Sequence, residues 1–214
     1  MKIKNELPLL IIVALPLIYL ASIWNRLPRK IPVHWNMHGE IDRWGNKNEL
    51  LFIVLMLPVF TYVLFLVIPK IDPKGQLEKM GKKYQNLKFL LTGLMSALAM
   101  FIIYSAQTQS LLNAGFFVFL LGILYVVAGN YFKTLQPNYF IGIRTPWTLE
   151  NQKVWKKTHQ LAGKLWFGGG ILIILSNFVF NNRINFIVLM AISILIILIP
   201  VVYSYHTFKE ITRQ

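Results

Sequence analysis

Six long apolar stretches most strongly constrain how this 214-residue chain can fold. Each is close to the roughly 20 residues that an α-helix needs to cross a bilayer. Only 14% of the residues are charged and 56% are hydrophobic, whereas about a quarter of a soluble domain is charged. Lipid is therefore the expected solvent for most of the apolar side chains. The predicted spans are approximately Leu7–Trp24, Leu50–Pro69, Phe89–Ala106, Ala114–Phe132, Leu165–Phe180 and Phe186–Tyr205.

The basic residues predict the orientation of these spans. Of the 22 Lys and Arg residues, sixteen lie in segments on the same side as the N-terminus and six lie on the other side. Because loops rich in Lys and Arg stay inside the cell, we expect both termini in the cytoplasm. The net charge of +14 then suits anionic lipid headgroups, and we predict no direct contact with nucleic acid.

Several kinds of chemistry are disfavoured by the residues that are absent. The six spans contain no Asp, Glu, Lys or Arg beyond their first residues, and the chain has no cysteine. A pump driven by buried carboxylates is therefore not expected, because its proton path would need such groups. We find no Ser-His-Asp arrangement, no paired carboxylates and no phosphate-binding glycine loop. We predict no catalytic residue and no cofactor.

Small residues predict where helices pack closely. Gly115, Gly122 and Gly129 recur every seven residues along the fourth span, so another helix can approach this face. Gly93 and Ala97 form a second pair of this kind on the third span.

The segment Leu27–Lys47, between the first two spans, predicts a small extracytoplasmic cap on an otherwise all-α protein. Pro28 and Pro32 favour extended backbone before them. Apolar and polar residues alternate after Lys30, as in a strand, and Gly39 and Gly45-Asn46 favour turns. We expect a short hairpin lying on the outer membrane surface.

Polar residues gather in this predicted cap. His34, His38, Glu40 and Asp42 lie close together in the sequence, and His with carboxylates can bind zinc. Their spacing matches no zinc motif, so we predict no metal. A hydrogen-bonded loop core around His34, Asn36 and Asp42 is favoured, and recognition of an external ligand is compatible with it.

The segment Gln136–Lys164 is the second polar region. Thr148 is predicted to cap a helix that runs from Leu149 into the fifth span. Trp155 and His159 would share a face of that helix, with lysines mostly elsewhere. Two interpretations remain: an elbow on the membrane surface that orders the fourth and fifth spans, or a docking surface facing the cytoplasm.

These two regions resemble a known family. The run Asn-Tyr-Phe-Ile-Gly-Ile-Arg-Thr-Pro-Trp-Thr-Leu from Asn138 to Leu149, followed by Trp155 and His159, resembles the motif of the SdpI immunity-protein family. The run Ile-Pro-Val-His-Trp-Asn from Ile31 to Asn36 is similar to the small domain of unknown function that precedes it in that family.

The resemblance implies a bacterial inner-membrane protein that protects the cell from a secreted peptide toxin. It also implies signalling, in which the protein holds a small helix-turn-helix transcriptional repressor at the cytoplasmic face. We divide the chain into a two-span unit, residues 1–88, and a four-span unit, residues 89–214. The alternative function is a transporter or permease for a small molecule or peptide, because prolines are predicted to kink several spans.

The resemblance also implies two sets of site residues. Those for recognition of an outer ligand are His34, Trp35, Asn36, Gly39, Asp42 and Lys47. Those for the inner signalling motif are Asn138, Gly142, Arg144, Thr145, Pro146, Trp147, Thr148, Trp155 and His159.

Overall fold

The computed structural model describes residues 3–36, 40–109 and 114–213. Two residues considered above, His38 and the predicted recognition residue Gly39, lie outside this described part.

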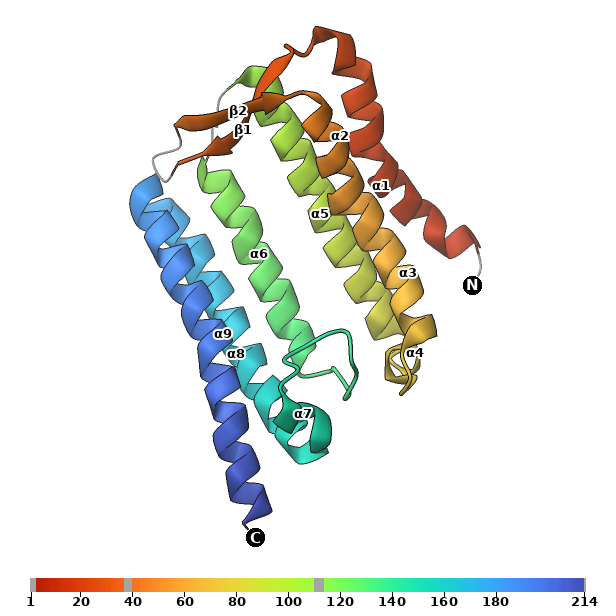
Figure 1. The fold of residues 1–214 in the computed structure, drawn as a ribbon, viewed down its shortest axis with the longest axis vertical. Helices are drawn as coiled ribbons and strands as arrows, with labels where there is room; N and C mark the ends of the chain where they lie inside the picture. The colour runs from red at the N-terminus through yellow and green to blue at the C-terminus, as the bar shows by residue number, and fades with distance from the viewer. Residues whose placement is uncertain (1–2, 37–39, 110–113, 214) are drawn as a thin grey trace.

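The predicted all-α membrane fold with six spans is confirmed. Six helical segments are long and apolar enough to cross a membrane, and Figure 1 shows them running along the length of the molecule. The second is continuous from α2 through a π-helical segment, η2, into α3, and Pro58 lies inside η2. The spanning elements are α1 (Ile3–Ile23), α2 (Asn48–Val54) with η2 (Leu55–Phe60) and α3 (Thr61–Ile71), α5 (Lys82–Thr108), α6 (Ala114–Phe132), α8 (Gln152–Val179) and α9 (Asn182–Thr212). The short elements are η1 (Trp24–Arg26), α4 (Gln76–Lys79) and α7 (Pro146–Glu150).

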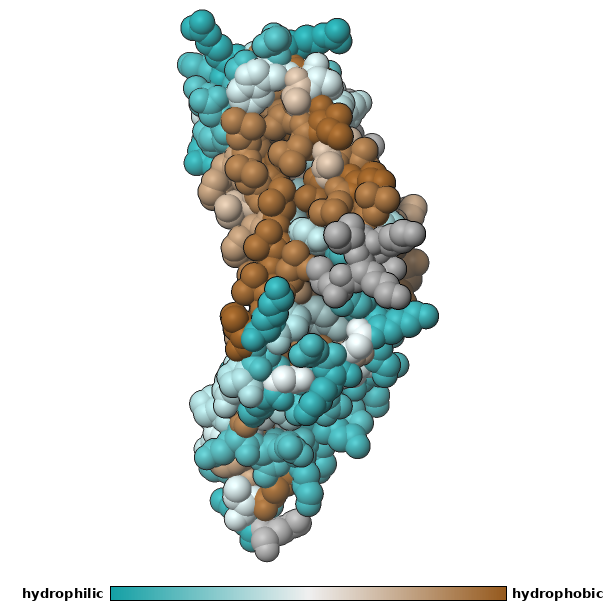
Figure 2. Space-filling view, turned by 90° about the vertical axis from the view of Figure 1, so that its right-hand side faces the viewer, coloured by the Kyte–Doolittle hydropathy of each residue, from teal (hydrophilic) through white to brown (hydrophobic). Residues whose placement is uncertain are grey.

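The outer surface of the helices is apolar. Figure 2 shows a hydrophobic band across one face, with hydrophilic surface at both ends of the molecule. Large apolar side chains of the spanning helices are well exposed, such as Phe52 at 64% and Phe178 at 76%. Contiguous apolar surface of this kind is not tolerated in water. The chain is a multi-pass membrane protein, and the lipid bilayer covers these side chains.

A two-stranded antiparallel hairpin forms the predicted cap. Strand β1 (Lys30–Trp35) pairs with β2 (Ile41–Asn46), with register shifts between Pro32 and Trp35. Ile31 is fully buried in a cluster with Leu50 and Ile103, so the cap is packed onto α2 and α5.

The cap and the segment around α7 lie at opposite ends of the helices (Figure 1). This separation is what the predicted orientation requires. That the cap end is extracytoplasmic and the termini are cytoplasmic stays a prediction.

The glycine stripe of α6 packs closely against α8, as predicted. A Cβ atom at Gly129 would lie 2.3 Å from the backbone nitrogen of Phe167, and one at Gly122 would lie 3.2 Å from the carbonyl oxygen of Gly170. The prediction for Gly93 and Ala97 is wrong. A Cβ at Gly93 would meet no neighbour within 4 Å, because small residues at this spacing can also face away from other helices.

Helix α5 packs against α1, η2 and α3 on one side and against α6 on the other. It therefore connects the first two spans to the last three. The division of the chain at residue 88 stays a prediction.

Prolines in three spanning helices each free a backbone carbonyl. Pro16, Pro69 and Pro200 have no N–H, so the carbonyl four residues earlier loses its helical donor. In lipid, that oxygen needs another donor. A side chain of a neighbouring helix supplies one in each case. The hydrogen bonds run from Ser96 Oγ to the Ile12 oxygen (2.6 Å), from the Tyr84 hydroxyl to the Phe65 oxygen (2.8 Å) and from Trp166 Nε1 to the Ile196 oxygen (3.0 Å).

The Ser96 bond to Ile12 can be tested with a double-mutant cycle. We expect Ser96→Ala to lower the free energy of unfolding by about 0.6 kcal/mol, and by no more than about 1.7 kcal/mol, the range found for hydrogen bonds between membrane helices. In a Pro16→Ala background the same substitution should cost almost nothing, because the restored N–H of residue 16 can bond Ile12. Unfolding in mixed detergent micelles measures both values. Equal costs in the two backgrounds would contradict this account.

Candidate functional site

The segment from Gln136 to Asn151, which we call the elbow, begins with a loop built around Asn138. This side chain is fully buried. Its amide nitrogen donates to the carbonyls of Gln136 (2.9 Å) and Ile141 (3.0 Å). Its oxygen accepts from the backbone nitrogens of Phe140 (2.9 Å) and Ile141 (2.7 Å). Asn138 therefore satisfies four backbone groups and determines the course of the loop.

Gly142 and His159 hold the next turn of the elbow. Gly142 has φ +115°, and a Cβ there would lie 2.4 Å from His159 Nε2. His159 Nε2 accepts from the backbone nitrogen of Ile143 (3.0 Å), while its Nδ1 donates to the Trp155 carbonyl (2.9 Å). The two bonds together define a neutral imidazole with its proton on Nδ1. The rings of Trp155 and His159 stack with centroids 4.0 Å apart.

The helix caps differ from the prediction. Thr148 is not an N-cap, because Thr145 caps the short helix α7 and Thr148 stands at its third position. The two threonines form a capping box, in which the backbone nitrogen of each donates to the hydroxyl of the other. The predicted continuous helix from Leu149 is also wrong. The backbone is extended at Asn151, whose side chain caps α8 separately.

The elbow is tied to the last helix. Thr145 Oγ1 lies 3.1 Å from Ser204 Oγ of α9, at hydrogen-bond distance. The ring of Trp147 packs on Tyr205, also of α9, with centroids 5.1 Å apart. Pro146 occupies the first turn of α7, where its missing N–H costs nothing. The elbow therefore links α8 to α9.

Most residues of the predicted inner motif build this scaffold. Asn138, Thr145, Thr148, Trp155 and His159 are all buried. Arg144 and Pro146 are exposed, and Trp147 is half-buried. The Arg144 Nη1 donates to the carbonyl of Tyr139, an exposed residue in the same loop. A partner could touch only the exposed residues directly.

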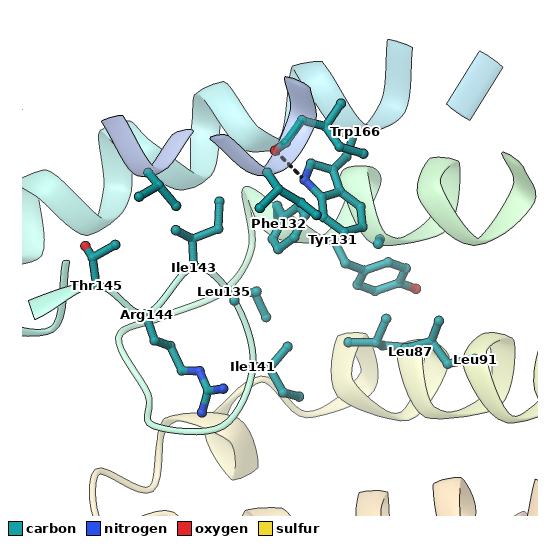
Figure 3. A pocket seen from close by; sticks show the side chains of 15 residues that line it. Leu87, Leu91, Tyr131, Phe132, Leu135, Ile141, Ile143, Arg144, Thr145 and Trp166 are labelled. Carbon is teal, nitrogen blue, oxygen red and sulfur yellow. Dashed lines mark hydrogen bonds between the residues drawn. The ribbon is translucent and has the colours of Figure 1, made fainter. Parts of the chain in front are cut away.

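An apolar cavity lies beside the elbow. Its volume is about 420 Å³, and it is bounded by α5, α6, α8, α9 and the elbow. Figure 3 shows Leu87 and Leu91 on one side and Trp166 on the other, with Ile143 and Arg144 on the loop at the left of the view. We call it the elbow cavity.

At the opposite end, His34 and Asn36 hold the cap together. The Nδ1 of His34 donates to Asp42 (2.6 Å) across the hairpin. The amide of Asn36 donates to the Glu40 carboxylate (3.0 Å) and accepts from the Glu40 backbone nitrogen (3.1 Å). The structure thus brings His34 and Asp42 together, while Asn36 pairs with Glu40.

Lys47 supports the base of the cap rather than its tip. Its Nζ donates to the Trp24 carbonyl (3.1 Å) and lies 4.6 Å from the centroid of the Trp24 ring. Both contacts involve the ammonium group of Lys47 and the same residue, Trp24. Lys47 therefore positions the cap against the end of α1.

A second cavity, the cap pocket, lies beneath the hairpin. It has a volume of about 300 Å³ and is lined by the cap and by residues of α2, α5, α6 and α9. Trp35 lines it, and its Nε1 is buried without a hydrogen-bond partner among the described residues. A buried N–H group of this kind lowers stability unless a ligand or solvent atom accepts a hydrogen bond from it.

No metal site emerges from the described residues. Within them, no three His, Cys, Asp or Glu side chains come together.

The sequence did not predict the buried ion pair between Lys88 and Glu6. Lys88 donates to Glu6 (2.6 Å), and both side chains are less than 10% exposed, at 3% and 8%. Tyr62 donates to the other oxygen of Glu6 (3.3 Å), so the group joins α1, α3 and α5. The predicted third span starts at Phe89 and so leaves Lys88 out, but Lys88 lies inside α5. The signal available was Glu6, an acidic residue directly before the first apolar run.

The tight contact at Gly142 makes a testable prediction. We expect Gly142→Ala to destabilise the protein by about 1–3 kcal/mol through backbone strain alone, because positive φ of this size is nearly confined to glycine. Displacement of His159 should add to this cost. The matched control is Gly93→Ala, where a Cβ meets no neighbour. Thermal unfolding in detergent compares the two, and similar stabilities would refute the role given to Gly142.

The sequence was compared with known proteins. Residues 134–204 match the SdpI/YfhL protein family, and residues 11–57 match a domain of unknown function, DUF1648. The chain is 25% identical over 216 residues to "Immunity protein SdpI" of Bacillus subtilis (strain 168), covering 97% of this chain and 98% of that protein. No solved structure matches. These matches confirm the resemblance found in the sequence: the chain is similar to the SdpI/YfhL protein family over residues 134–204 and to an immunity protein over nearly its whole length.

Proposed function

We propose that this protein is a membrane immunity protein that gives resistance to a secreted antimicrobial peptide toxin. The full-length relative is named as an immunity protein. The observation that carries the proposal is the cap pocket with the indole N–H of Trp35, which has no hydrogen-bond partner among the described residues. A peptide toxin that acts on membranes offers both apolar side chains and backbone carbonyls.

The cap pocket suits part of such a peptide. Its lining is largely apolar, with Ile31, Phe101 and Phe186 among its walls. An apolar side chain of the toxin would fill the pocket, and a backbone carbonyl would accept from Trp35 Nε1. Burial of the apolar side chain would supply most of the affinity, and the hydrogen bond to Trp35 would fix the orientation of the peptide.

The other recognition residues act around this pocket in the proposal. His34 and Asn36 line it, so they would contact the bound peptide. Asp42 holds His34 in place, and Lys47 holds the cap on η1, directly after α1. In this arrangement the cap faces outward, where a secreted toxin arrives, and both termini are cytoplasmic.

The inner motif would then serve signalling. We propose that the exposed face of the elbow, with Arg144, Pro146 and Trp147, holds a small helix-turn-helix repressor. Helix α9 is a physical connection between the two ends, since Phe186 lines the cap pocket and Ser204 bonds to the elbow. A shift of α9 on toxin binding would move the elbow, because packed interfaces change between discrete arrangements.

The transporter alternative has less support. Its substrate would need a polar path across the bilayer. The elbow cavity and the cap pocket lie at opposite ends and both have mainly apolar walls.

Toxin resistance gives the main test. Expression of the protein in a toxin-sensitive bacterium should raise the peptide concentration needed for killing. Trp35→Phe should lower this tolerance about fivefold, because it removes one hydrogen bond worth about 1 kcal/mol. Folding should be unaffected, since the lost N–H has no partner among the described residues.

The matched control is Trp44→Phe, which changes an exposed tryptophan of the same hairpin outside the pocket. Its killing curves should equal those of the unchanged protein. Killing curves that do not differ between cells with and without the protein, for toxins of several producer strains, would reject the immunity proposal.

Repressor recruitment is tested separately. Trp147→Ala should abolish binding of the proposed helix-turn-helix repressor, measured by a bacterial two-hybrid assay, while toxin tolerance stays unchanged. Thr148→Val, which removes a buried hydroxyl of the capping box, should impair both. If Trp147→Ala also removes tolerance, the tryptophan supports folding rather than the docking surface.

A further inference from the structure

We propose that the elbow cavity is a binding site for one anionic phospholipid, with an acyl chain in the cavity and the phosphate on Arg144. This proposal is independent of toxin recognition, but it shares Arg144 with the surface proposed above for the repressor. It starts from the walls of the cavity, which are built almost entirely of apolar side chains from four helices and the elbow. Its volume of about 420 Å³ lies within the usual range of ligand pockets, about 300–1,000 Å³.

One cation stands among these apolar walls. Arg144 is the charged residue that lines the cavity within the described part of the chain. One of its N–H groups donates to the Tyr139 carbonyl, and a guanidinium has five such donors. None of the described carboxylates forms an ion pair with it. The remaining donors are therefore suited to a phosphate, which arginine binds with two parallel hydrogen bonds.

A second cation lies nearby. Lys74, in the segment before α4, places its Nζ 4.9 Å from the centroid of the Tyr139 ring. Lys74 and Arg144 thus both contact Tyr139, and their charges add at this end of the molecule. Basic pockets between membrane helices are a known means of binding anionic lipid headgroups.

The cavity is also accessible from lipid. Ile197 of α9 forms part of its wall and is 51% exposed on the outer surface of the helices. Leu91 and Ala128, from α5 and α6, form the wall on the other side. A lipid can therefore enter sideways from the bilayer, with its chain against α5 and α9 and its headgroup at the elbow, all of which line the cavity.

The test uses the full chain purified in detergent. Dioleoylphosphatidylglycerol, dioleoylphosphatidylcholine or inorganic phosphate is added in increasing amounts, and thermal unfolding is recorded. We expect a saturable rise in melting temperature with phosphatidylglycerol, because a ligand that binds only the folded state stabilises it. Phosphatidylcholine and phosphate alone should have little effect, since one lacks net charge and the other lacks the acyl chain.

Three variants locate the site. Arg144→Gln should lower the apparent affinity for phosphatidylglycerol roughly tenfold or more, as expected for loss of charge-assisted hydrogen bonds. Ala128→Phe should reduce it by filling the cavity while leaving Arg144 in place. Lys156→Gln, which removes an exposed charge on α8 outside the cavity, should behave like the unchanged protein and serves as the control.

Each contrary result overturns the proposal. Equal stabilisation by phosphatidylcholine would show that lipid only surrounds the protein and does not occupy a specific site. Stabilisation by phosphate alone would show an anion site that needs no acyl chain. An Arg144→Gln protein that still responds like the unchanged protein excludes a phosphate contact at this residue. If Arg144→Gln does not fold, Ala128→Phe decides, and an unchanged response from that variant rejects the cavity.

Discussion

The structure depends on one requirement of the bilayer, which is that backbone polar groups in lipid must find partners within the protein. Prolines in α1, α3 and α9 each break a helical hydrogen bond, and a side chain of a neighbouring helix restores it. These bonds connect α5 to α1 and α3, and α8 to α9. Since hydrophobic burial does not drive helices together in lipid, such specific contacts, with the glycine packing of α6 on α8, determine which helices meet.

The elbow applies the same requirement outside regular helices. Asn138, Thr148 and His159 form their hydrogen bonds with the loop backbone. They therefore hold the loop in its conformation and do not form a contact surface for a partner. The groups that remain available to bind a ligand are polar atoms without a full set of hydrogen-bond partners. Within the described part of the chain, Trp35 beneath the cap and Arg144 beside the elbow cavity are of this kind, and both stand against apolar walls. Both proposed sites, one at each end of the protein, would therefore suit an amphipathic ligand.

The predictions from sequence succeeded where one local pattern decides the outcome. The spans follow from uninterrupted apolar length, and the cap follows from alternating residues between proline and glycine turns. They failed where two candidates compete for one role. Thr145 and Thr148 are both suitable caps, and the proline at 146, which suits the first helical position, favours the earlier one. From the sequence, Lys88 could belong to a basic loop or to a helix. Its ion pair with Glu6, which only the tertiary structure shows, explains why it is buried among the helices.

The sequence alone determined that this chain crosses a membrane six times, that it carries a polar cap and a polar elbow, and which family motifs these contain. Hydropathy and turn preferences are properties of neighbouring residues, so they can be read along the chain. Only the tertiary structure decided which donor meets each proline-freed carbonyl, which motif residues are buried, and where cavities remain. Those outcomes depend on residues up to 88 positions apart, such as Tyr19 and Gln107, whose proximity arises only when the helices pack.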